Sequence, residues 1–195
     1  MIIALLWISV PWHRVWHRVK VPILIQCFRH GPEEVRGYAA VFLAHSDGDP
    51  KMMVSVLLPG LKDKAENVRE MTAIALGNIH QKPERVVPAL LASIDAETNA
   101  TSLVLKYAAG AIGYFGTNAK PWSPILVGMI ESNRFGFWSG SARVALYKIN
   151  PAIGKPLIDE YNAEVSNRQA QAQFEYSEKQ RRKTVVPTNQ PPTKP

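Results

Sequence analysis

Apolar residues along much of the chain recur at helical spacing. In the segment Val21-Pro-Ile-Leu-Ile…Phe28 they fall at positions i, i+1 and i+4, which line one side of a helix. Proline is accepted in the first turn of a helix, where its missing N–H costs nothing, so these segments are predicted to begin helices. The same pattern starts at Val54, Val87 and Ser123, with prolines at Pro22, Pro88 and Pro124.

A second pattern follows each of these segments. Four stretches align with one another, with apolar and small residues in matching places, at spacings of about 33, 36 and 34 residues. Such a period is typical of helical-hairpin solenoids. The aligned stretches are 34–45, 67–78, 103–114 and 137–148.

Each repeat therefore reads as a helix A, a polar turn and a helix B, and the predicted turns contain the breakers Gly31, Asp63, Asn99 and Gly136. One hairpin cannot bury its own apolar face, whereas a stack of hairpins buries a continuous core. The sequence predicts an all-α superhelix, an α-solenoid of about four hairpins with one more helix after it. Glycines near the ends of the B helices are expected to act as left-handed caps: Gly77, Gly113 and Gly116.

The stretch Asn67-Val-Arg-Glu-Met-Thr-Ala-Ile-Ala-Leu-Gly77 resembles the short bacterial HEAT repeat, Val-Arg-x-x-Ala-Ala-x-Ala-Leu-Gly. The resemblance covers roughly residues 19–150 and implies the solenoid fold, while it leaves the function open. Family members often pair a turn Asp with an Arg six residues later, and Asp63 and Arg69 match that spacing. His30, Leu105 and Ser139 interrupt this ladder, so we expect it to be mostly absent.

Arg143 stands where earlier repeats have alanine, at Ala40, Ala73 and Ala109. A long charged side chain at a position otherwise used for close packing suggests that nothing stacks beyond it. We therefore expect the fourth repeat to be a cap whose outer side meets water.

The ends of the chain differ from its middle. Residues 1–18 are apolar and rich in tryptophan, and we interpret them as a capping helix or an interfacial membrane anchor. Residues 19–165 form the predicted solenoid. Residues 166–195 form a polar, basic tail that is rich in proline and predicted to be partly disordered. The formal net charge is +7, and because much of it lies in this tail, a nucleic-acid-binding face on the body has little support.

Motifs for catalysis and cofactor binding are absent from the sequence. Gly110-Ala-Ile-Gly-Tyr-Phe-Gly116 contains glycines but follows no strand, so it does not predict a phosphate loop. His13 and His17 share a helix face, yet no third metal ligand lies near them, and Cys27 is the single cysteine. We assign no catalytic, cofactor-binding or metal-binding residues.

Binding to a protein partner is the function that the pattern favours, through the B helices, which line the concave face of a solenoid. Aromatic and thioether side chains at the positions not used by the core are typical of interfaces. The alternatives are a membrane-surface adaptor anchored by residues 1–18 and a HEAT-like enzyme accessory of the lyase-like chaperone type. We expect a cytoplasmic location. The predicted partner-binding residues are Tyr38, Met71, Ile74, Asn78, Tyr107, Tyr114 and Lys148.

Overall fold

The computed structural model describes residues 12–184, with side chains described from residue 20 to residue 181. Every regular element in this part of the chain is a helix. The α-helices are α2 (Trp12–His30), α3 (Glu33–Ala44), α4 (Pro50–Leu57), α5 (Glu66–Ile79), α6 (Pro83–Ala96), α7 (Leu103–Tyr114), α8 (Ser123–Glu131), α9 (Ser139–Ile149) and α10 (Pro151–Thr184). Short 3₁₀ helices connect them: η1 (Leu58–Lys62), η2 (Gly116–Trp122) and η3 (Gly136–Trp138).

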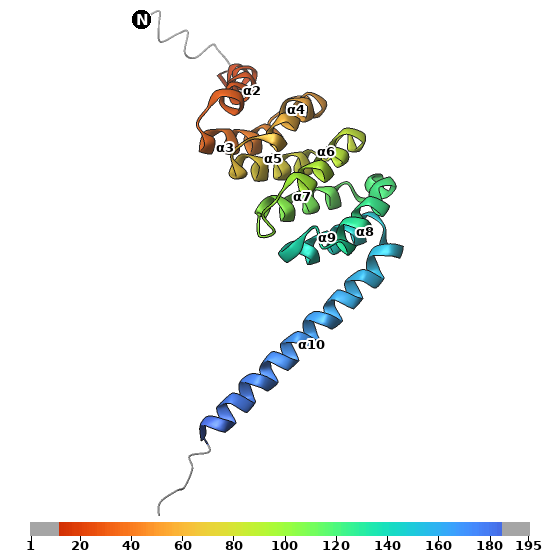
Figure 1. Cartoon of the computed structure of the whole chain (residues 1–195). Helices are drawn as coiled ribbons and strands as arrows, with labels where there is room; N and C mark the ends of the chain where they lie inside the picture. The colour runs from red at the N-terminus through yellow and green to blue at the C-terminus, as the bar shows by residue number, and fades with distance from the viewer. Residues whose placement is uncertain (1–11, 185–195) are drawn as a thin grey trace, which may run out of the picture.

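The helices form two layers, as an α-solenoid requires (Figure 1). The B helices α3, α5, α7 and α9 lie side by side in one layer, and each packs on the next. The A helices α4, α6 and α8 form the second layer, with α2 at the N-terminal end of the stack. The all-α solenoid predicted from the two interleaved patterns is confirmed.

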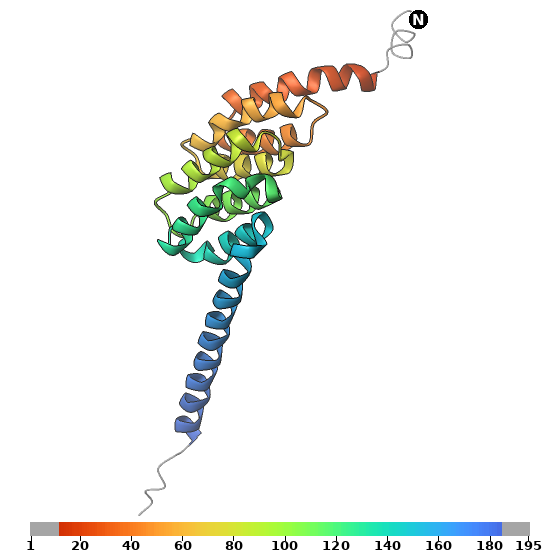
Figure 2. The same cartoon turned by 90° about the vertical axis from the view of Figure 1, so that its right-hand side faces the viewer.

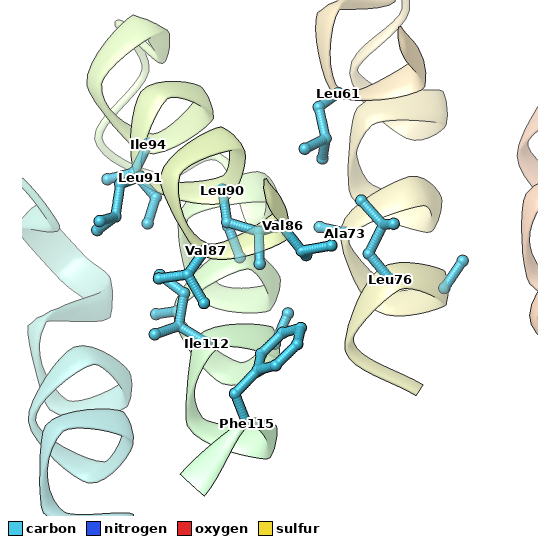
Figure 3. Packing of buried hydrophobic residues seen from close by; sticks show 14 of the residues in the cluster. Leu61, Ala73, Leu76, Val86, Val87, Leu90, Leu91, Ile94, Ile112 and Phe115 are labelled. Atoms are coloured by element: carbon cyan, nitrogen blue, oxygen red, sulfur yellow. The ribbon is translucent and has the colours of Figure 1, made fainter. Parts of the chain in front are cut away.

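The core lies between these layers and runs continuously through the repeats. Leu76 of α5, Leu90 of α6 and Ile112 of α7 are fully buried and belong to one cluster (Figure 3). Each repeat buries its apolar side chains against the repeats next to it. No repeat is therefore expected to be stable by itself.

Successive B helices approach closely where one of them carries glycine. A Cβ on Gly77 would lie 2.9 Å from the Cα of Ala111, and one on Gly113 would lie 3.1 Å from the Cα of Ala145. The predicted capping role is therefore wrong for these two glycines, which lie inside α5 and α7 and serve as helix contacts. The left-handed C-cap of α5 is His80, with φ of 34°, and Gly116 does adopt a left-handed φ of 52°.

Two of the three prolines expected in first helical turns lie deeper. Pro22 is well inside α2, and Pro88 is inside α6, which begins earlier at Pro83. Pro124 does lie in the first turn of α8. The rings of Pro22 and Pro88 are exposed, so water can reach the carbonyl groups that their missing N–H groups leave unpaired.

Arginines connect the turns of successive repeats. Arg36 donates from Nε and Nη2 to the carboxylate of Asp63, at 3.0 and 2.7 Å, and Arg69 Nη2 donates to Glu97 Oε2 at 2.8 Å. Arg134 of the fourth turn donates to the backbone oxygens of Glu97 and Asp95. The expectation that the ladder would be mostly absent is wrong, because the pairs form between repeats.

Helix α10 packs on α9 at its start and then projects away from the repeats (Figures 1 and 2). A Cβ on Gly154 would lie 2.3 Å from the backbone nitrogen of Tyr147, so the corner between the two helices is tight. The outer side of the fourth repeat therefore meets α10, and its expected exposure to water is wrong. The segment boundaries expected after residues 18 and 165 both fall inside helices, the first inside α2 and the second inside α10. Residues 1–11 and 185–195 lie outside the described part of the chain.

Candidate functional site

The predicted partner-binding residues all lie on the B helices and outside the buried core. Tyr38 and Tyr114 are 61% and 59% exposed, and Asn78 and Lys148 are exposed as well. Met71, Ile74 and Tyr107 are half-buried. We call the surface that these residues share the B-helix face.

Three of these residues come together at one groove of about 960 Å³ at the C-terminal end of the face. Tyr107 and Tyr114 reach it from α7, and Lys148 reaches it from α9. Tyr38, Met71, Ile74 and Asn78 do not line it. We call this site the α7–α9–α10 groove, and its further lining includes Lys106, Gly110, Phe137, Trp138, Arg143, Val144, Ile158, Tyr161, Glu164 and Arg168.

Cations cover the aromatic rings of the groove. Lys106 Nζ lies 5.1 Å from the ring centres of both Tyr107 and Trp138, and Lys148 Nζ lies 5.2 Å from that of Tyr114. Each ring attracts the cation through its negative face. The indole nitrogen of Trp138 also donates to the backbone oxygen of Thr101 at 3.2 Å, which connects the groove to the turn before α7.

One wall of the groove is formed by Arg143 of α9 and Tyr161 of α10. The Arg143 guanidinium lies 5.0 Å from the ring centre of Tyr161. A Cβ on Gly140 would lie 3.0 Å from the Tyr161 ring, so glycine there lets the ring lie against α9. Arg143 also donates to Ser139 Oγ, while its Nε is buried without a hydrogen-bond partner in the described part of the chain.

The groove carries an excess of positive charge. Its cations are Lys106, Arg143, Lys148 and Arg168, and its carboxylate is Glu164, which pairs with Arg168 at 3.2 Å. Lys106, Arg143 and Lys148 form no ion pair within 4 Å with a carboxylate in the described part of the chain, although the charge of Glu70 acts on Lys106 from outside the groove. The groove is therefore suited to a ligand that brings negative charge.

Glu70 of α5 borders this region through its charge interaction with Lys106. Burial, followed by repulsion from Glu66, raises the pKa of Glu70 above its ordinary value, and Lys106 only partly offsets this. Ionised Glu70 is thus disfavoured by the fold. Glu70 belongs to α5 and does not line the groove.

Comparison with known families fits this architecture. Residues 21–104 match the family model described as HEAT repeats. The chain contains HEAT repeats. The match covers α3 to α6 and much of α2, and the same layered arrangement continues through α7 to α9. Neither a curated protein nor a solved structure matches the chain significantly.

HEAT repeats generally serve as protein-interaction scaffolds, and the family is typically non-enzymatic. Among the residues that the structure describes, no group of three or more His, Cys, Asp or Glu side chains is arranged to hold a metal ion. Within residues 12–184, no helix has the length and apolarity needed to cross a membrane. The capping helix or membrane anchor expected at residues 1–18 lies outside the residues whose side chains the structure describes.

Sequence reasoning missed the charged half of the groove beside these HEAT repeats. Lys106 and Arg143 each occupy B-helix positions where other repeats carry different residue types, which is the signal that marks them. Ile158 and Tyr161 come from α10, and their helical spacing with Leu157 and Val165 indicates a packed face. That this face closes a groove on α9 depends on the fold.

Proposed function

We propose that the chain is a non-enzymatic scaffold that binds a protein partner through the B-helix face, with the α7–α9–α10 groove as the principal contact. The observation that carries this proposal is the groove itself. Exposed aromatic side chains line it together with cations that lie over aromatic rings, and its volume of about 960 Å³ is large enough for a peptide segment.

The composition of the groove supports a protein ligand. Tyr, Trp and Arg are the residue types that contribute most to binding energy at interfaces, and all three occur here. Phe137 is 73% exposed at the rim, and its ring packs edge-on against Trp138 at 4.9 Å between ring centres. The rim therefore offers apolar area that a partner can cover without any rearrangement of the helices.

Site-specific photo-crosslinking in the cells that make the protein tests this proposal. A photo-reactive phenylalanine analogue replaces Tyr114 in one variant, and Ile125 of α8 in a matched control. Both positions are similarly exposed, at 59% and 50%, but Ile125 lies in the layer of A helices. We expect a discrete crosslinked protein from position 114 and none from position 125.

A second variant makes the result quantitative. Tyr114→Ala should weaken binding of the partner identified in this way by about tenfold, because it removes an exposed aromatic contact and the platform under Lys148. The helical circular dichroism signal should stay unchanged, since the side chain lies outside the core. Equal crosslinking at both positions, or unchanged affinity of the alanine variant, would contradict the proposal.

A further inference from the structure

The charges of the groove identify the kind of segment that would occupy it. A basic groove with aromatic rings can bind nucleic acid, whose bases stack on the rings, or an acidic peptide, whose carboxylates pair with the cations. Here Lys106 covers Tyr107 and Trp138, Lys148 covers Tyr114, and Arg143 covers Tyr161. One face of each of these rings is therefore already occupied by a cation, which reduces the stacking surface for bases and favours carboxylates.

The positions of Lys106 and Tyr114 on α7 give an approximate spacing for the two charged ends. Lys106 lies at one end of α7 and Tyr114, with Lys148 over it, lies near the other end. Eight residues separate positions 106 and 114, which corresponds to about 12 Å along a helix. In an extended peptide, residues four positions apart are about 13 Å apart and point to the same side.

The floor between the two charged ends is open. Gly110 lies midway along α7, and nothing lies within 4 Å of where its Cβ would be. Val144 of α9, which is 47% exposed, and Ile158 of α10 line the same groove and give it apolar surface. A side chain midway between two acidic residues would meet this patch.

From this geometry we infer that the α7–α9–α10 groove binds an extended acidic peptide segment of the partner, with two carboxylates four residues apart and an apolar residue midway. The inference rests on the proposed scaffold function. One carboxylate meets Lys106 and the other meets Lys148. Arg143 faces the middle of the segment from the wall opposite α7.

Fluorescence anisotropy with purified full-length protein tests this inference. The probe is a labelled Gly/Ser-rich peptide that contains two glutamates four positions apart and a phenylalanine midway. Its control has glutamine in place of both glutamates. We expect the acidic peptide to bind at least about tenfold more tightly than the control, and the difference to shrink as salt is added.

Three variants in the groove and one control variant locate the binding. Lys106→Gln and Lys148→Gln should each weaken binding about threefold, whereas Lys51→Gln on α4 should have no effect, because Lys51 is exposed far from the groove. Gly110→Leu should abolish binding by filling the floor. The open space and the helical position predict that this variant remains fully folded, which thermal unfolding checks.

Several outcomes would overturn the inference. They are equal binding of the glutamine peptide, no measurable binding of the acidic peptide, or wild-type affinity of the Gly110→Leu protein. Displacement of the acidic peptide by single-stranded DNA at lower concentrations than by unlabelled peptide would instead favour nucleic acid. If the acidic peptide fails while crosslinking at position 114 still captures a protein, the scaffold function stands and only this partner class is wrong.

Discussion

Arg69 of the second repeat and Glu97 of the third lie 2.8 Å apart between Nη2 and Oε2. The Glu97 side chain is only 7% exposed, so the bond is shielded from water. Arg69 also donates to the backbone oxygens of Asp63 and Lys64 in its own turn. One side chain therefore connects two turns, and this connection fixes how adjacent repeats stack.

Glu97→Gln should destabilise the protein by about 1–2 kcal/mol at neutral pH, because it removes the charge from a shielded bond to a guanidinium. Urea unfolding followed by circular dichroism measures the loss. Glu84→Gln is the matched control, since Glu84 is 59% exposed and lies 3.7 Å from Lys82, and it should change the free energy of unfolding by less than about 0.5 kcal/mol. Equal effects of both changes would show that the ladder adds no stability.

The ladder also predicts acid sensitivity. Burial raises the pKa values of Asp63 and Glu97, but the hydrogen bonds from Arg36 and Arg69, their positive charges and backbone N–H donors together outweigh it, and both pKa values end below the ordinary range. A carboxylate with a lowered pKa stabilises the fold above its ordinary pKa of about 4, and this stability is lost as pH falls from there through the lowered pKa. The urea midpoint of the wild type should thus fall between pH 5 and pH 3, by about twice as much as that of the Asp63→Asn/Glu97→Gln double variant.

Glu70 should show the opposite dependence. Burial and the charge of Glu66 raise the pKa of Glu70, so ionisation of Glu70 opposes folding. The protein is therefore more stable while Glu70 is protonated, and this extra stability is lost as pH rises through the pKa of Glu70 in the folded protein. Glu70→Gln should therefore stabilise the protein at pH 7 by about 0.3 kcal/mol after solvent screening, and by nothing at pH 4. Thermal unfolding at both pH values measures this, and stabilisation that is larger at pH 4 would contradict it.

The repeats could be predicted from the sequence because small and apolar residues recur with one period in both helices of each hairpin. The ladder could not, because its acceptors come from turns of unequal length. Asp63 precedes its repeat's arginine by six residues, whereas Glu97 lies eight residues before the equivalent Leu105. A search at fixed spacing within one repeat finds the first and misses the second, and it also misses that each pair spans two repeats.

The groove was predictable only in part for a similar reason. Tyr107, Tyr114 and Lys148 follow from their positions on the B helices. The wall of Tyr161 over Arg143 depends on the direction in which α10 leaves α9, and the tight contact at Gly154 that sets this direction leaves no periodic signal in the sequence.

Two glycines provide a matched test of helix packing. Gly77→Ala should destabilise the protein by about 1–3 kcal/mol, because the new methyl group would lie 2.9 Å from both Cα and Cβ of Ala111 and must push α5 and α7 apart. Gly110→Ala should stabilise it by about 0.5–1 kcal/mol, since nothing lies nearby and alanine favours the helix. Chemical unfolding of both variants measures the difference, and a neutral Gly77→Ala change would show that the stack adapts.

Truncations within α10 should separate its packed part from its projecting part. Residues 169–181 are exposed apart from the half-buried Glu178, and Phe174 and Tyr176 are 67% and 65% exposed. Removing residues 169–195 should therefore change the free energy of unfolding by less than about 0.5 kcal/mol. Removing residues 156–195 should cost about 2–4 kcal/mol, because Leu157 and Tyr161 no longer cover α9 and the last repeat loses its neighbour. Urea unfolding of the two truncated proteins measures both effects.

The longer truncation should also weaken binding to the partner captured at position 114, since it removes one wall of the groove, while the shorter one should not. If both truncations destabilise the protein equally, the projecting part of α10 has contacts that hold the repeats together, and the division of this helix at residue 168 is wrong.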